Sequence, residues 1–219
     1  DQQRWLRTVE HRRDQVQAQS LALAARNSGG TSVAQMLNLL EPHDLKKLGH
    51  NSPQYIHLFI EAKKLAFADR AKYLGDPDFV PVPSDQLLSS NYIAQRMSNF
   101  DATKATPSCM VNAGNPLVES EHTTHFSIVD EEGNAVACTT TLNGSYGSGV
   151  VVDGAGFLLN NEMDDFSIAP NTPNRFGLVG SNANVIAPGK RMLSSMAPTI
   201  LTRGGRLFMV LGSPGGATI

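Results

Sequence analysis

The stretch from Thr123 to Leu142 reads TTHFSIVDEEGNAVACTTTL, and it decides how the rest of the chain is interpreted. It holds two runs rich in β-branched residues, 124–130 and 135–142, on either side of Glu-Glu-Gly-Asn. Two such runs joined by a short segment that contains Gly are typical of a β-hairpin. Because paired strands bring side chains together on one face, we expect the hydroxyl group of Thr141 to lie near that of Thr123.

The chain before this hairpin is predicted to be helical. Residues 1–26 contain spaced apolar side chains and no Gly or Pro, which indicates a first helix that ends at a break over 27–30. Apolar residues at 33, 36, 37 and 40 form one face of a second helix, capped by Thr31 or Ser32.

A third helix has the clearest start, because Ser52 offers a cap and Pro53 suits the first turn. It is expected to run to about Tyr73, and short helices capped by Ser84 or Ser90 follow. Residues 103–122 show no periodicity and favour an exposed connection or processing loop.

After the hairpin the pattern predicts further strands over 156–160, 196–202 and 207–211, with a long loop over 170–188. Helices first and strands later favour an α+β or layered α/β arrangement. We expect a helical part, 1–122, and a β-rich part, 123–219, to form one domain together, since neither half closes its own core.

The composition excludes some classes of function. A chain of 219 residues with a formal net charge of −2 has no global field that favours nucleic acid or an anionic membrane. It contains no apolar run of the roughly 18 residues that span a bilayer. The start, Asp1-Gln2-Gln3-Arg4, has neither an initiator Met nor a signal-peptide pattern, so we expect a processed product or a piece of a longer protein.

Three carboxylates crowd into the segment NNEMDDF that begins at Asn160. Like charges this close repel, so a cationic partner such as an α-ammonium group would stabilise the segment. We expect Glu162 and Asp165 to bind that group. An acidic loop or a metal site is the alternative, but the spacing lacks the Ca²⁺-loop pattern and no metal is expected. Asn143, with two donors and an acceptor, suits a zwitterionic ligand or the end of a strand.

Two other clusters suit anions. Ser194 and Ser195 offer hydroxyl groups and backbone amides to a carboxylate, although Ser-Ser before an apolar run is also a common turn. Gly215 and Gly216 follow a buried-looking strand, and successive glycines can present N–H groups to an oxyanion. A phosphate loop is the alternative, but the Lys-Ser/Thr of a P-loop is missing.

The set and order of these motifs resemble the γ-glutamyltranspeptidase family. The resemblance covers Ser28 to Ile219 and includes GHNS from Gly49, ADR from Ala68 and YLGDPDF from Tyr73, besides the clusters above. It implies an N-terminal-nucleophile (Ntn) hydrolase fold, an αββα sandwich of which this chain holds a part. The chain would span the end of the large subunit and the start of the small subunit of a zymogen.

The resemblance also implies the chemistry. Autoprocessing would cut the His122-Thr123 bond, and Thr123 would then be the nucleophile of an acyltransferase and hydrolase of glutathione metabolism. Thr141 would support it, Gly215 and Gly216 would hold the oxyanion, and Phe176 would belong to a lid over 170–181. A new N-terminal Thr is suited to this work because its free amine, with a pKa near 7.7–8.0, can act as the base.

From the same resemblance we expect glutathione or other γ-glutamyl compounds as substrates, no cofactor, no nucleic-acid partner, and a periplasmic or secreted location. Residues 1–26 do not look like the family, and the arginine that pairs with the substrate carboxylate is expected in a part not included here. One rival is a cephalosporin or glutaryl acylase of the same fold, which acts on acyl groups without an α-amino group. Another is a non-catalytic truncated fragment.

Overall fold

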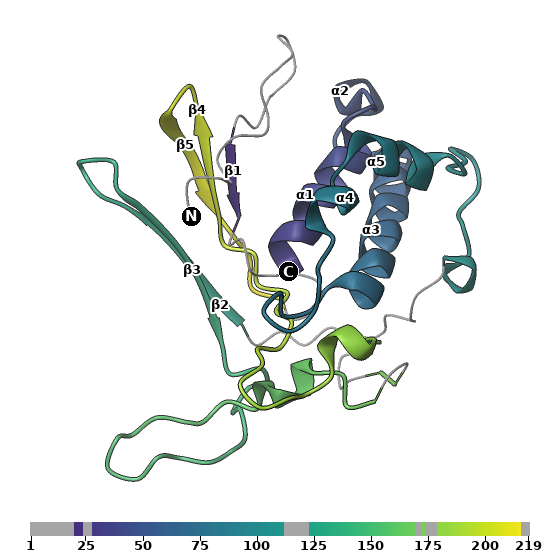
Figure 1. The fold of residues 1–219 in the computed structure, drawn as a ribbon. Helices are drawn as coiled ribbons and strands as arrows, with labels where there is room; N and C mark the ends of the chain where they lie inside the picture. Colours follow the sequence, from purple (N-terminus) through teal and green to yellow (C-terminus); the bar gives the residue numbers. More distant parts are fainter. Residues whose placement is uncertain (1–19, 24–27, 112–122, 170–171, 174–178, 216–219) are drawn as a thin grey trace. The chain divides into compact units, whose positions relative to one another are not determined.

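The structure is a computed structural model that describes residues 20–23, 28–111, 123–169, 172–173 and 179–215 (Figure 1). The chain divides into two compact units. Unit 1 comprises Asp1–Gly30, Glu119–Glu162 and Ser194–Ile219, and unit 2 comprises Thr31–Val118 and Met163–Leu193. Both units therefore draw on residues from either side of position 122, where the sequence pattern changes from helix to strand.

Unit 1 contains the strands. A three-stranded antiparallel sheet has the order β1-β4-β5, formed by β1 (Ser20–Leu23), β4 (Thr199–Arg203) and β5 (Arg206–Leu211). The helix predicted for residues 1–26 is wrong over 20–23, which pair with β4; the rest of that range lies outside the described residues. Backbone pairing with a strand almost 180 residues away in the sequence overrides the local helical pattern, as tertiary context commonly does.

The predicted hairpin is confirmed as β2 (Thr123–Val129) and β3 (Ala135–Thr141), which pair antiparallel. The turn between them is stabilised by Asp130, whose Oδ1 accepts a hydrogen bond from the backbone N–H of Asn134 at 2.7 Å. Gly133 has a φ of 86°, a left-handed conformation that glycine adopts without steric cost. The local turn chemistry therefore fixes the register of the whole hairpin.

Two strand predictions need correction. Residues 156–160 form no strand but a single bridge, Val151 to Leu158, next to a turn in which Gly154 and Gly156 both have positive φ. The strand expected from 196 begins only at Thr199, because Pro198 has no N–H to donate to a ladder. The strand expected over 207–211 is confirmed in β5.

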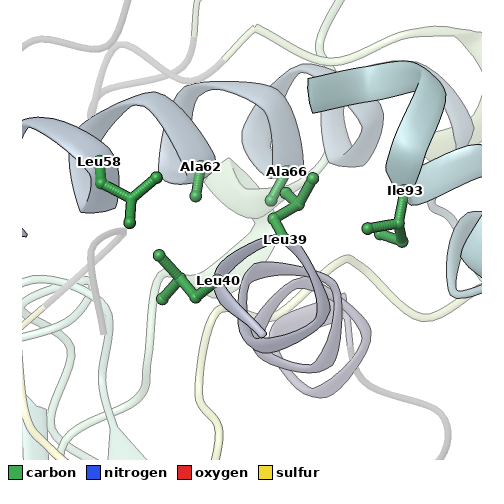
Figure 2. Close-up of a cluster of buried hydrophobic side chains, with 6 residues drawn as sticks. All are labelled: Leu39, Leu40, Leu58, Ala62, Ala66 and Ile93. Atoms are coloured by element: carbon green, nitrogen blue, oxygen red, sulfur yellow. The ribbon is translucent and has the colours of Figure 1, made fainter. Parts of the chain in front are cut away.

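Unit 2 is built around helices, which are α1 (Ser28–Leu40, whose first turn belongs to unit 1), α2 (Leu45–Leu48), α3 (Pro53–Tyr73), α4 (Ser84–Leu87) and α5 (Ser90–Met97). Short 3-10 turns are η2 (Ser108–Met110), η3 (Glu162–Asp165) and η4 (Asn182–Asn184). The core of unit 2 is a cluster of buried side chains from α1, α3 and α5 (Figure 2): Leu39, Leu40, Leu58, Ala62, Ala66 and Ile93.

The start of α3 is confirmed, since Ser52 Oγ accepts a hydrogen bond from Tyr55 N at 3.1 Å and Pro53 is the first helical residue. The caps of the next two helices lie one residue earlier than predicted. Pro83 precedes α4, and Ser89 caps α5 by accepting from Tyr92 N at 3.4 Å. In the part of the chain that the structure describes, no helix is both long and apolar enough to cross a membrane.

Candidate functional site

Thr123 and Thr141 are direct partners in the hairpin register, as the sequence predicted. Thr123 is the first residue of β2 and Thr141 the last of β3, so the pair lies at the open end of the hairpin. The hydroxyl oxygen of Thr141 accepts a hydrogen bond from the backbone N–H of Asn143 at 3.0 Å. Two interactions therefore hold Thr141 opposite Thr123. One is the pairing of β3 with β2, and the other is the hydrogen bond from the following loop.

Asn143 is buried and has a φ of 69°, in the left-handed region that Asn tolerates better than most residues. Its Nδ2 donates to the carbonyl oxygen of Asn161 at 3.1 Å, and Asn161 Oδ1 accepts from Gly144 N at 2.9 Å. Asn161 N also donates to Leu142 O at 3.1 Å. Asn161 thus ties the end of β3 to the acidic segment that follows it, a role that its sequence context did not reveal.

Glu162 follows Asn161 directly, and its side chain is half-buried. Within the described residues its Oε1 atom has no hydrogen-bond partner, and burial raises the pKa of the carboxyl group above its ordinary value. A cationic ligand would stabilise the charged form of this half-buried carboxyl group, because its attraction offsets the hydration that is lost on burial.

Asp165 belongs to unit 2 and lies in η3, where its carbonyl oxygen accepts a hydrogen bond from Asn184 Nδ2 at 2.7 Å. Its negative charge acts on Arg70, a buried residue of α3. Burial lowers the pKa of the Arg70 guanidinium, and the charge of Asp165 offsets part of that effect. In the sequence, Arg70 stood out only as part of the motif that begins at Ala68. The folded unit shows that Arg70 is buried and that its charge interacts with that of Asp165.

Ser194 and Ser195 lie in unit 1 with the start of α1. Gly29 N donates to Ser194 O at 3.1 Å, and a Cβ at Gly29 would come within 2.7 Å of Ser195 O. The Gly-Gly pair at 29–30 was predicted as a turn before the helix, but α1 begins at Ser28 and includes both glycines. The glycine is needed there because the backbone of residues 195–196 approaches too closely for a side chain.

The glycine-rich segment after β5 begins beside β2. A Cβ at Gly212 would overlap the imidazole ring of His125, whose Nε2 lies 2.8 Å from that position. The His125 ring nitrogens contact Thr139 Oγ1 at 2.7 Å and Ser127 Oγ at 3.0 Å. His125 is two residues from Thr123 on the same strand face, and the sequence analysis assigned it no role.

Gly215 is described and has a φ of 142°, which a residue with a Cβ rarely adopts. Three of the predicted site residues lie outside the described residues: His122, Phe176 and Gly216. Of the segment 170–181, which was expected to form a lid, the structure describes 172–173 and 179–181, and Pro173 and Val179 form an antiparallel bridge.

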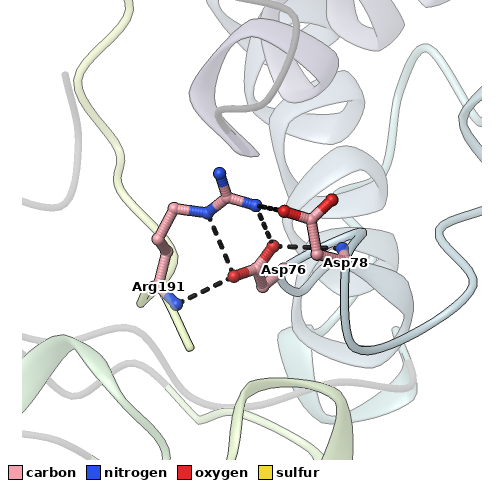
Figure 3. Close-up of polar contacts among 3 residues, drawn as sticks. All are labelled: Asp76, Asp78 and Arg191. Atoms are coloured by element: carbon pink, nitrogen blue, oxygen red, sulfur yellow. Dashed lines mark hydrogen bonds and ion pairs between the residues drawn. The ribbon is translucent and has the colours of Figure 1, made fainter. Parts of the chain in front are cut away.

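An ion-pair cluster in unit 2 holds the segment that leads to Ser194 (Figure 3). Asp76, whose side chain is 1 % exposed, accepts hydrogen bonds from Arg191 Nε at 3.0 Å, Nη2 at 2.5 Å and backbone N at 2.8 Å. Arg191 also donates to Asp78. Hydrogen bonds from Arg191 hold the pKa of the Asp76 carboxyl well below its usual range.

Comparison with known proteins agrees with these motifs. The family described as Gamma-glutamyltranspeptidase matches residues 5–219. The chain is 54 % identical over 195 residues to a glutathione hydrolase proenzyme of Pseudomonas aeruginosa, covering 88 % of this chain and 34 % of the relative. It is 49 % identical over 194 residues to the glutathione hydrolase proenzyme of Escherichia coli, covering 88 % of this chain and 33 % of the relative.

Among solved structures, a cephalosporin acylase from Bacillus halodurans is similar with a TM-score of 0.63 and 26 % identity, over 84 % of this chain and 30 % of that one. The mixed helix-and-sheet architecture is thus that of an Ntn hydrolase, as predicted. The chain spans about a third of the length of the curated relatives it matches.

The family match extends back to residue 5, whereas the alignments with the two relatives cover 88 % of the chain. Together with the relatives above, the match shows that the chain belongs to the γ-glutamyltranspeptidase family.

Proposed function

We propose that the complete protein containing this chain cuts itself between His122 and Thr123 and then transfers γ-glutamyl groups from glutathione or related compounds to water or to an amine. The observation that carries the proposal is the register of Thr123 against Thr141, with Thr141 held by the N–H of Asn143, in a member of this family. The two glutathione hydrolase proenzymes at 54 % and 49 % identity support the same reaction.

Self-cleavage would use the hydroxyl group of Thr123. Its Oγ attacks the carbonyl carbon of His122, the peptide C–N bond breaks, and an ester to Thr123 Oγ remains. Water then opens this ester, which leaves a carboxylate on His122 and a free α-amino group on Thr123. That amine has an ordinary pKa near 7.7–8.0, so near neutral pH a useful fraction is unprotonated and can act as a base.

Turnover would repeat the same attack on the substrate. The Thr123 amine takes the proton from Oγ as Oγ bonds to the γ-carbonyl carbon, and N–H groups at Gly215 and Gly216 stabilise the oxyanion. The amine passes the proton to the leaving nitrogen as the amide bond breaks. Water or an acceptor amine then attacks the γ-glutamyl ester, and Thr123 Oγ regains its proton.

Recognition of the glutamyl head is assigned to two groups of residues. Asn143, Glu162 and Asp165 would bind the α-ammonium group, and Ser194 and Ser195 the α-carboxylate. The half-buried carboxyl of Glu162, with its raised pKa and unsatisfied Oε1 among the described residues, favours a substrate that brings a cation. Glutaryl and cephalosporin side chains without an α-amino group would leave this carboxylate uncompensated.

After cleavage, the piece ending at His122 and the piece beginning at Thr123 would stay together as the two subunits of one enzyme. The reaction as written needs no cofactor. We also propose that the protein works in the periplasm or outside the cell, as its resemblance to the family suggests.

Two measurements on the complete protein test the proposal. Denaturing mass spectrometry should give two fragments divided between residues 122 and 123. The purified protein should cleave γ-glutamyl-p-nitroanilide and leave glutaryl-p-nitroanilide intact. The opposite substrate preference would favour an acylase, the alternative suggested by the likeness to the cephalosporin acylase of B. halodurans.

A further inference from the structure

A single buried amide joins two segments to which the proposed function gives substrate contacts. Asn184 is the last residue of η4 and is 4 % exposed. Its Nδ2 donates to the carbonyl oxygen of Asp165 at 2.7 Å, and its Oδ1 accepts from Leu193 N at 3.1 Å. Its own carbonyl oxygen accepts from Ser167 N at 2.9 Å. All of these residues belong to unit 2.

The two hydrogen-bond partners of the Asn184 side chain lie in or next to the segments assigned to substrate binding. Asp165 closes the acidic segment, and Leu193 directly precedes Ser194. A free amino acid head carries its ammonium and its carboxylate on one carbon atom, so the protein groups that read them must keep a fixed separation. The Asn184 amide spans the two segments with one hydrogen bond to each, and it can therefore set that separation.

The turn that carries Asn184 is itself held firmly. Ser181 Oγ accepts from Ala183 N at 3.2 Å and donates to Lys72 O, near the end of α3, at 3.0 Å. A Cβ at Gly75 would overlap the carbonyl group of Ala183, so the backbone after α3 packs directly against the turn. These contacts give Asn184 a rigid base, which a residue that orients others requires.

The segment on the other side is held at a second point. Arg191, two residues before Leu193, is bound by Asp76 through its side chain and its backbone N–H (Figure 3). The stretch from Arg191 to Leu193 is thus fixed at both ends, and its Leu193 end reaches the Asp165 segment through Asn184.

We propose that Asn184 is a positioning residue that fixes the spacing between the ammonium-binding and carboxylate-binding segments, and so selects substrates with a free α-amino acid head. The inference rests on the proposed function of Asp165, Ser194 and Ser195. Asn184 does not touch the substrate; it acts through the backbone of Asp165 and Leu193.

The test compares Asn184→Leu with Asn182→Leu in the complete protein. Leu has nearly the shape of Asn but neither donates nor accepts, so Asn184→Leu removes both hydrogen bonds at once. Asn182 lies in the same turn and is exposed, which makes its substitution the matched control. The substrates are γ-glutamyl-p-nitroanilide and its analogue in which the α-carboxylate is an amide.

Asn184→Leu is expected to raise KM for γ-glutamyl-p-nitroanilide by roughly tenfold, the effect of losing hydrogen bonds to buried groups, while kcat and self-cleavage change little. The ratio of kcat/KM for the carboxylate over the amide substrate should fall, because the carboxylate no longer meets its partners at the correct distance. Asn182→Leu should leave KM and the ratio unchanged. A purely structural role would lower activity on both substrates equally and leave the ratio constant, which would overturn the inference.

If Asn184→Leu does not fold, Asn184→Asp replaces it. This variant keeps the acceptor for Leu193 N and puts a carboxylate oxygen where the donor to Asp165 O was, so the same change of KM and ratio is expected. A folded variant with unchanged KM and ratio overturns the inference alone. An unsubstituted protein that leaves γ-glutamyl-p-nitroanilide intact overturns the proposed function, and the inference with it.

Discussion

The imidazole ring of His125 fills the space in which a side chain at Gly212 would have to lie. His125 stands on β2 two residues after Thr123, and Gly212 opens the segment that leads from β5 to Gly215. The ring is fixed by its contacts with Thr139 and Ser127, so it cannot rotate away without losing both. β2 and the glycine-rich segment are therefore in direct contact, and the contact requires glycine at position 212.

Gly212→Ala is expected to destabilise the protein and to lower turnover, since the new methyl group would collide with the His125 ring. Overpacking of this kind costs about 1–3 kcal/mol. Thermal unfolding and γ-glutamyl-p-nitroanilide kinetics measure the two effects. Removing the ring in the double variant Gly212→Ala, His125→Ala should restore part of the lost stability relative to His125→Ala alone. Strictly additive losses would mean that the ring is not the obstacle.

Thr123→Ala is expected to stop both self-cleavage and turnover, because both reactions need the same hydroxyl oxygen. Denaturing mass spectrometry should show one uncut chain. Thr123→Ser keeps a hydroxyl and should still be cut. Thr124→Ala is the matched control, since Thr124 is exposed and points to the opposite face of β2. Residual cleavage between 122 and 123 in Thr123→Ala would refute the assignment of the nucleophile.

Asp165→Asn is expected to weaken substrate binding while self-cleavage continues, because the uncut chain contains no ligand ammonium for Asp165 to bind. KM for γ-glutamyl-p-nitroanilide should rise by roughly tenfold or more, the usual loss when a charged hydrogen-bond partner is removed. Asp153→Asn changes an exposed carboxylate of unit 1 and serves as the control. Equal losses of binding and of cleavage would show that Asp165 is structural.

The pH dependence of kcat/KM should reveal Glu162. Burial raises the pKa of this carboxyl group, so it takes up its proton at a higher pH than an ordinary glutamate as the solution is acidified. The protonated group no longer attracts the α-ammonium of the substrate, and kcat/KM should therefore show a second fall on the acid side, besides the fall caused by protonation of the Thr123 amine. In Glu162→Gln this second fall should be absent and only the fall caused by the Thr123 amine should remain, while kcat/KM is low throughout; an unchanged profile would assign the second fall to another group.

Asp76 should contribute to stability in a defined pH range. Hydrogen bonds from Arg191 lower its pKa in the folded state, so the carboxylate form is favoured by folding. This contribution is complete above the unfolded pKa of about 3.9 and is lost as the pH falls below it. Asp76→Asn should therefore lower Tm at pH 7, and its deficit relative to the unsubstituted protein should shrink below about pH 4.

Asp78→Asn is the control for this experiment, since Asp78 meets the same arginine but its side chain is 57 % exposed. Its effect on Tm should be small, as it is for most exposed ion pairs. A deficit in Asp76→Asn that stays constant down to pH 2 would contradict the role of the charge.

Features predicted correctly from the sequence are those that short-range chemistry decides. The hairpin and the pairing of Thr123 with Thr141 follow from two β-branched runs and a Gly-Asn turn, because turn geometry sets the register. The start of α3 follows from Ser52 and Pro53, which satisfy the first helical turn by themselves.

The errors have two causes, a distant segment in one case and local glycines in the other. Residues 20–23 were assigned to a helix, yet they pair with β4. The local sequence pattern does not reveal this pairing, because the partner strand lies far away in the sequence. Residues 156–160 were assigned to a strand, but among the described residues they form a single bridge, from Leu158 to Val151, beside a turn in which Gly154 and Gly156 have positive φ.

By itself, then, the sequence determined the hairpin, its opposed threonines and the order of the polar clusters along the chain, since each depends on neighbours within a few residues. Only the tertiary structure decided that His125 excludes a side chain at Gly212, that Arg191 is bound by Asp76, and that Asn184 joins Asp165 to Leu193. The contacts of Arg191 and His125 form between segments far apart in the sequence, and those of Asn184 join three loops with no regular pattern between them. A buried polar group selects its partner by geometry that exists only after the chain has folded.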